Sequence, residues 1–212
     1  MDRIISVCID FILPPSEDVQ KARAVPAADL LERVRLSRSA EGVYSALPYS
    51  DEAVRAVIRA NKFHSDRSSA RKLALVLEEL LHYVLDEYAL ENARECLVLV
   101  PTPTSPKRAR QRGRHQVKAI LTELPAEVQN SFIYADVLSR GDRESQLRVP
   151  KEKRHANIAG AFYIPARHHA LVSGKTAVII DDVSESGATM ADMTRALKEA
   201  GTHHAIGVAL AH

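Results

Sequence analysis

The sequence is poor in the residues on which several classes of protein depend. It holds only two cysteines, Cys8 and Cys96, and they form neither a CxxC pair nor a disulfide framework. This usage fits a reducing compartment and leaves no set of thiolates for a structural zinc. Aromatic residues make up 5% of the chain and none lies within residues 101–130, which disfavours a single-stranded DNA surface built on stacked bases.

A strong net charge and long apolar runs are missing as well. The formal net charge is +2, so binding to a polyanion would have to come from local clusters of basic residues. The apolar stretch 4–13 is interrupted by Asp10 and ends at Pro14-Pro15 without a signal-peptide cleavage pattern. It is also shorter than the roughly 20 apolar residues of a spanning helix. We therefore expect a cytoplasmic protein with no membrane span.

The pattern along the chain predicts an α/β fold. Residues 1–42 are expected to form a short helical N-terminal extension, with a helix at 27–35 and a linker at 37–42, and residues 43–212 the main domain. Helices are predicted after Ser50, with Ser50 as the cap, at 68–91 and at 188–201, and strands at 42–49, 96–101, 132–138, 161–164, 177–181 and 205–211. Because strands and helices alternate from Cys96 onward, the sheet is expected to be mainly parallel and flanked by helices.

The segment AVIIDDVSESGAT, residues 177–189, carries the clearest chemistry. A buried strand delivers Asp181 and Asp182, whose carboxylates at the carboxyl end of a parallel strand are placed to accept hydrogen bonds from ribose hydroxyls. A short loop then opens a helix, where free N–H groups and the helix dipole favour a phosphate, and Gly187 allows close backbone approach. The expected contacts to the 5-phosphate are Glu185, Ser186, Gly187, Ala188 and Thr189.

A basic segment follows the strand at 96–101. Six Lys or Arg residues fall between Lys107 and Lys118, beside hydroxyl donors at Thr102 and Thr104. These groups suit a leaving pyrophosphate, but the same charges would suit DNA phosphates or a solvated helix face. The sequence leaves these three interpretations open.

The 177–189 segment resembles the signature of type I phosphoribosyltransferases, which has four apolar residues, two acids and a T/S-G-x-T phosphate loop. VLVPTPTSPKRARQRGRHQ (98–116), RANKFHSD (59–66) and RGDRESQLRVPKEKRHANIAGAF (140–162) are similar to segments of the ComF/GntX family of competence proteins. The resemblance implies a type I phosphoribosyltransferase-like fold that binds phosphoribosyl pyrophosphate with Mg²⁺. The zinc-ribbon cysteines common in that family are missing, so zinc is not expected.

The same resemblance implies further site residues. It places a pyrophosphate loop at Thr102, Pro103, Thr104, Lys107 and Arg108. It also places a flexible loop that includes Arg140, Gln146 and Arg154, which would close over the ligand, with a plain surface loop as the alternative. No residue is expected to hold a metal directly.

Glu185 departs from the family, which usually has threonine there. It could be an acid at the helix start or a general base, since 6-oxopurine phosphoribosyltransferases have an aspartate in a similar position. The candidate catalytic residues are thus Asp181, Asp182 and Glu185. Two functions remain: transfer of ribose phosphate to an acceptor that the sequence does not identify, or a non-catalytic nucleotide-sensing module that binds single-stranded DNA or a helicase in DNA uptake or repair.

Overall fold

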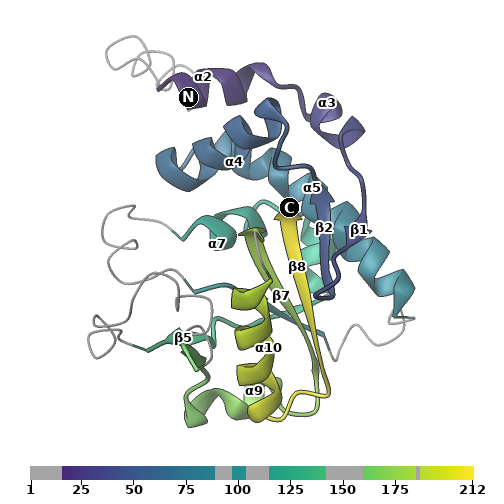
Figure 1. Ribbon diagram of the computed structural model, residues 1–212, viewed down its shortest axis with the longest axis vertical. Coiled ribbons are helices and arrows are strands. Elements are labelled where there is room, and N and C mark those ends of the chain that lie inside the picture. The colour runs from purple at the N-terminus through teal and green to yellow at the C-terminus, as the bar shows by residue number, and fades with distance from the viewer. Residues whose placement is uncertain (1–15, 89–96, 104–114, 142–159, 185–186) are drawn as a thin grey trace.

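The computed structural model describes residues 16–88, 97–103, 115–141, 160–184 and 187–212 (Figure 1). Its main sheet has the strand order β1-β2-β8-β7-β3-β4, in which all neighbours are parallel except β1 and β2. The strands are β1 Ser37–Arg38, β2 Val43–Leu47, β3 Leu97–Pro101, β4 Ile133–Tyr134, β7 Thr176–Val183 and β8 His204–Ala211. The expected α/β fold with a mainly parallel sheet is confirmed.

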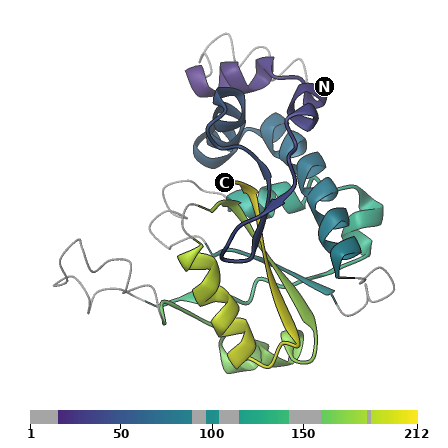
Figure 2. The same ribbon diagram turned by 45° about the vertical axis from the view of Figure 1, so that its right-hand side comes forward.

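Helices cover both faces of this sheet (Figure 2). Side chains alternate along β7, so Val178 and Ile180 pack into one apolar cluster with α5 and α7, and Ala177 and Ile179 pack into another with α10. The helices are α2 Glu17–Ala24, α3 Ala27–Glu32, α4 Glu52–His64, α5 Arg67–Glu87, α7 Gln116–Leu121, α8 Ala126–Asn130, α9 His169–Val172 and α10 Ala188–Glu199, with a 3₁₀ turn at Ala166–His168. Burial on both faces explains why β7 reads as a continuous apolar run.

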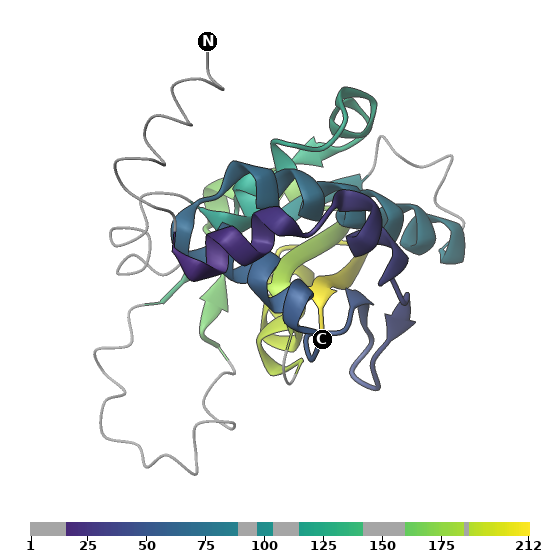
Figure 3. The same cartoon turned by 90° about the horizontal axis from the view of Figure 1, so that it is seen from above.

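Helices from the N-terminal part lie beyond the carboxyl ends of the central strands (Figures 1 and 3). Helix α2 packs on α4 through Val19 and Ala22, and the ion pair between Lys21 and Glu52 links the same two helices. The sequence did not predict α2, because only two of its eight residues are buried and they form too short a stripe to stand out. The division into residues 1–42 and 43–212 stays a prediction.

Several expected elements differ in detail from the structure. The linker at 37–42 begins with β1, which pairs antiparallel with β2. Asp51, and not Ser50, caps α4, because its Oδ1 accepts hydrogen bonds from the N–H groups of Ala53 and Val54 at 2.8 and 3.1 Å. The strand at 132–138 is reduced to Ile133–Tyr134, the two residues that are register partners of Val98 and Leu99 on β3.

None of the helices in the described part of the chain is long and apolar enough to cross a membrane.

A small ribbon of β5 (Ser139–Arg140) and β6 (Phe162–Tyr163) is anchored on α10 by one buried acid. The Asp192 carboxylate accepts hydrogen bonds from the N–H groups of Gly160 at 2.7 Å and Phe162 at 2.9 Å. It also accepts one from Arg195 Nε at 2.9 Å, and Arg195 in turn donates to the Phe162 carbonyl at 2.8 Å. These bonds fix the backbone of residues 160–162 against the helix that begins at the predicted phosphate loop.

Replacing Asp192 with alanine should lower the free energy of unfolding by about 1 to 2 kcal/mol, because two backbone N–H groups and a guanidinium lose their acceptor. Urea denaturation monitored by circular dichroism measures the loss. The matched control is Glu199→Ala, since Glu199 pairs with the same Arg195 but its side chain is 64% exposed. Equal losses in the two variants would contradict a special role for Asp192.

Candidate functional site

The carboxyl ends of β3 and β7 lie side by side and bring the first site residues together. Pro101 and Ile180 are register partners, and the Thr102 N–H donates to the Ile180 carbonyl at 2.9 Å. The Thr102 hydroxyl then donates to Asp181 Oδ1 at 3.0 Å, and the Asp182 N–H donates to the same oxygen at 2.9 Å. The structure therefore joins the first residue of the predicted pyrophosphate loop to the predicted ribose acids.

Asp182 faces the interior and is paired with a lysine from α4. Lys62 Nζ lies 2.8 Å from Asp182 Oδ2, and the carboxylate is only 3% exposed. The two atoms are within ion-pair distance but lack the angles of a hydrogen bond, so Oδ2 has no hydrogen-bond partner among the described residues. The Coulombic attraction between the two charges does not depend on those angles. Lys62 thus supplies the counter-charge for the buried acid.

Asp181 lies in a different electrostatic setting from Asp182. Burial, and then the neighbouring Asp182 charge, raise the pKa of Asp181 to about 7, although the Thr102 hydroxyl and the Asp182 N–H oppose that change. Near neutral pH, the Asp181 carboxyl group is therefore a mixture of its protonated and ionised forms. Bringing positive charge or hydroxyl donors to this edge of the sheet would favour the ionised form.

The start of α10 has the backbone that a phosphate loop needs. Gly187 adopts φ +64°, a left-handed conformation that favours glycine, and Ala188 begins the helix. A Cβ atom added at Gly187 would come within 2.9 Å of the Glu41 side chain, so close packing also requires glycine. Thr189 is exposed in the first turn. The predicted 5-phosphate contacts Gly187, Ala188 and Thr189 therefore lie together at the end of β7.

Two more buried polar atoms near this site have no hydrogen-bond partner in the described part of the chain: Asn61 Oδ1 and His115 Nε2. His115 caps α7, because its Nδ1 accepts a hydrogen bond from the Lys118 N–H at 3.3 Å, which leaves the proton of the neutral ring on Nε2. Burial lowers the pKa of His115, while the charges of Asp136 and Asp182 oppose this change. The Thr102 carbonyl also favours the protonated ring, but it does not meet hydrogen-bond geometry with Nε2.

The Asn61 amide nitrogen donates to the Gln116 carbonyl at 3.4 Å, which ties the end of α4 to the start of α7. Unpaired buried polar atoms are uncommon in proteins. Asn61, His115 and Asp182 contribute three of the four such side-chain atoms found among the described residues, which marks this region as polar and incompletely satisfied.

Several predicted site residues fall outside the described residues: Thr104, Lys107, Arg108, Gln146, Arg154, Glu185 and Ser186. Their predicted roles are not tested. Pro103 follows Thr102 at the end of β3, and Arg140 lies on β5 with its guanidinium 5.5 Å from the Phe162 ring centroid. The structure thus brings Thr102, Asp181, Asp182 and the start of α10 together, and it places Arg140 on the separate ribbon.

Four nearby residues were not predicted as site residues: Lys62, Asn61, His115 and Glu41. Each comes from a segment far in sequence from 177–189, and the contacts depend on how α4, α7 and the β1–β2 turn pack over the strand ends. The only signal available was Lys62 within RANKFHSD, a cation at the end of an otherwise amphipathic helix.

The side chains at this site also indicate how a metal ion could be held. No group of three or more His, Cys, Asp or Glu side chains among the described residues could hold one. Mg²⁺ in proteins is commonly held by one or two carboxylates together with water and the phosphates of a substrate. Two adjacent carboxylates beside the predicted phosphate loop would suit an ion that arrives with its ligand.

The C-terminal half of the chain matches a known family of domains. Residues 111–212 match the model of the phosphoribosyl transferase domain, a range that includes the acid pair and the start of α10. A search of curated protein sequences gives no match. One similar solved structure is described as the structure of the allosteric regulatory enzyme of purine biosynthesis. It has 16% sequence identity and a TM-score of 0.40, and the match covers 73% of this chain but only 30% of that one.

Proposed function

We propose that this protein, whose residues 111–212 are similar to a phosphoribosyl transferase domain, binds phosphoribosyl pyrophosphate with Mg²⁺ and transfers its ribose phosphate to a nitrogenous acceptor. The observation that carries the proposal is the arrangement at the end of β7. Two acids are followed within a few residues by a left-handed Gly187 at the start of a 12-residue helix. Membership of the ComF/GntX family is part of the proposal.

The chain's own residues would position the ligand. The N–H groups at the start of α10 bind the 5-phosphate, and Asp181 and Asp182 accept hydrogen bonds from the ribose hydroxyls. Ligand binding draws Asp181 into its ionised form, because hydroxyl donors stabilise the charge. Mg²⁺ arriving with the ligand at the edge formed by Asp181 and Asp182 would supply positive charge that neutralises the pyrophosphate.

The reaction breaks the bond between ribose C1 and the pyrophosphate oxygen, and the pyrophosphate leaves with the electron pair. A nitrogen of the acceptor then bonds to the oxocarbenium-like C1 and loses a proton to a base. Catalysis would rest on positioning and on electrostatic stabilisation of the leaving group. Glu185 is the proposed base, and the acceptor is not identified by these residues.

Binding is tested by thermal unfolding with phosphoribosyl pyrophosphate and Mg²⁺. At a ligand concentration of 100 times Kd we expect the protein to be stabilised by about 2.7 kcal/mol. Asp181→Asn should reduce this stabilisation, because it takes away the charge of the partly exposed carboxylate that accepts the ribose hydroxyls. The control is Asp136→Asn, an acid on the exposed surface beyond β4. No stabilisation of the native protein at millimolar ligand would refute the proposal.

Turnover is a separate measurement. Pyrophosphate release is followed with ammonium and with a panel of nitrogen heterocycles as acceptors. Glu185→Gln should keep the stabilisation by ligand and lose the release of pyrophosphate if Glu185 is the base. Loss of both would assign Glu185 to ligand binding instead.

The alternative of a single-stranded DNA or helicase-binding module rests on the basic segment 107–118. Only residues 115–118 of that segment are described, and the Lys118 ammonium lies 5.6 Å from the Tyr134 ring centroid. No contact in the described part of the chain favours DNA, so this alternative stays a hypothesis.

A further inference from the structure

We propose that a cavity between α7, α8 and β4 is a second ligand site, which takes a small aromatic carboxylate carrying a hydrogen-bond donor at its far end. The cavity has a volume of about 260 Å³. None of the residues that line it belongs to the predicted phosphoribosyl site. It opens on the sheet face that α5 and α7 cover, whereas the acid pair lies at the carboxyl ends of the strands.

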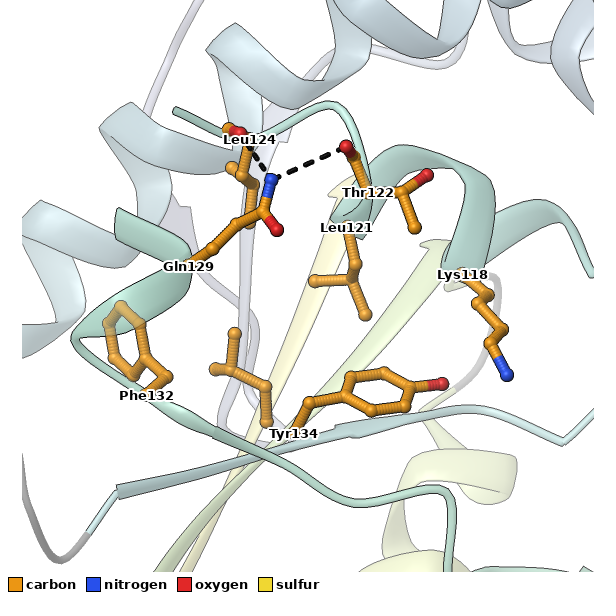
Figure 4. Close-up of a pocket in the computed structure, with 8 residues that line it drawn as sticks. Lys118, Leu121, Thr122, Leu124, Gln129, Phe132 and Tyr134 are labelled. Atoms are coloured by element: carbon orange, nitrogen blue, oxygen red, sulfur yellow. Dashed lines mark hydrogen bonds between the residues drawn. The ribbon is translucent and has the colours of Figure 1, made fainter. Parts of the chain in front are cut away.

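The walls of the cavity are apolar and partly aromatic. Figure 4 shows the side chains converging on one space, with Leu121 and Gln129 on one side and Tyr134 on the other. Leu99, Leu124 and Phe132 complete the lining. Tyr134 is 42% exposed although it is a large aromatic residue, so its ring faces open space. Such walls favour a flat, apolar ring.

Lys118 supplies a positive charge at one end. Its Nζ lies 5.6 Å from the Tyr134 ring centroid, and none of the ion pairs found among the described residues includes it. The Tyr134 hydroxyl points toward the same end (Figure 4). The partial burial of Tyr134 and the nearby Asp136 raise its pKa to about 12, so this hydroxyl stays protonated and can donate. An ammonium and a hydroxyl donor together suit a carboxylate.

Gln129 supplies a hydrogen-bond acceptor at the other end of the cavity. Its amide nitrogen donates to the carbonyls of Leu124 at 2.7 Å and Thr122 at 3.3 Å, so Oε1 is the atom left to accept a hydrogen bond from a ligand. The Thr122 hydroxyl is engaged as well, because it donates to the Ala119 carbonyl at 2.8 Å. The ligand should therefore carry its donor where it meets Gln129.

The volume of the cavity limits the size of the ligand. A cavity of about 150 Å³ in another protein holds benzene, so 260 Å³ suits one ring with two substituents. 4-Hydroxybenzoate has this form, with a carboxylate for Lys118 and a hydroxyl for Gln129, and it is the probe we choose. Its neutral analogue, 4-hydroxybenzamide, has the same shape without the charge.

The test is an NMR titration of the full chain with 4-hydroxybenzoate, following chemical shifts of residues around the cavity. We expect a dissociation constant near the millimolar range, and at least tenfold weaker binding both for 4-hydroxybenzamide and for the Lys118→Met variant. Lys118 is exposed, so this substitution should leave the fold intact. The control is Lys198→Met, an exposed lysine on α10 at the opposite face of the sheet, which should bind the probe as the native protein does.

A second variant, Tyr134→Leu, keeps an apolar wall but removes the ring and hydroxyl, and should also weaken binding. Equal affinity for the acid and the amide, or unchanged affinity in Lys118→Met, would overturn the proposal. So would shifts that cluster around Asp181 instead of the cavity. The outcome is independent of whether phosphoribosyl pyrophosphate binds.

Discussion

Replacing Lys62 with methionine should lower the free energy of unfolding by about 3 kcal/mol at pH 7. The Asp182 carboxylate is 3% exposed and Lys62 is its ion-pair partner, so the substitution leaves a buried charge without compensation. In a protein of this size the loss corresponds to a fall in Tm of roughly 6 to 12 °C. Urea denaturation at several pH values and a thermal scan measure it.

The double variant Lys62→Met/Asp182→Asn should recover a large part of the loss, because the buried charge goes together with its partner. Lys21→Met is the matched control: Lys21 also bridges to acids, Glu17 and Glu52, but its side chain is 49% exposed. That variant should change stability by less than about 1 kcal/mol. Similar effects of Lys62→Met and Lys21→Met would show that the Asp182 contact adds no stability.

Asp181→Asn should make the protein more stable, in contrast to Lys62→Met, and should weaken ligand binding. Asparagine Oδ1 can still accept the hydrogen bonds that Asp181 takes from Thr102 and from the Asp182 N–H. The variant lacks a charge that burial and Asp182 disfavour. We expect it to be more stable than the native protein by about 2 kcal/mol at pH 8, and to bind phosphoribosyl pyrophosphate at least tenfold more weakly.

The gain in stability from Asp181→Asn should depend on pH. The pKa of Asp181 is about 7 in the folded protein and near 4 in the unfolded chain, so the folded state holds the proton more tightly. Ionisation of this residue therefore lowers stability as the pH rises from about 4 to about 7. The pKa difference corresponds to roughly 4 kcal/mol, and we expect about half because Asp181 is partly exposed.

The measurement is a series of urea denaturations between pH 4 and pH 8 on the native protein and on Asp181→Asn. The two should agree at pH 4, move apart as the pH rises to about 7, and keep a nearly constant difference above that. A native protein whose stability relative to the variant does not change with pH would contradict the raised pKa. Glu127→Gln, an exposed acid on α8, serves as a control for a change of net charge alone.

Much of the fold could be predicted because β7 and α5 carry strong local signals. Residues 177–181 are buried on both faces of the sheet apart from Asp181, and an unbroken apolar run followed by acids and glycine indicates a parallel strand with a ligand loop. The apolar stripe of α5 recurs every three or four residues, which predicted its course to within a few residues of the observed 67–87.

The rest depended on contacts between segments distant in the sequence. Nothing near Asp182 in the chain indicates that Lys62, 120 positions earlier, is its partner, because that contact arises only when α4 packs across the strand ends. The alternation in 132–138 predicted a longer strand, but only Ile133 and Tyr134 pair with β3. Helix α2 gave no signal, since it needs α4 to bury its two apolar side chains.

The Asp192 contacts imply that two parts of the chain lose structure together. Its carboxylate joins the backbone at Gly160 and Phe162 to the second turn of α10. A short two-stranded ribbon is by itself marginally stable in water. Through Asp192, β6 instead shares the stability of a helix whose Met193 and Leu197 are fully buried. Strand β6 and helix α10 are separated in the sequence, but they thus belong to one cooperative unit of local unfolding, and this unit includes the start of α10.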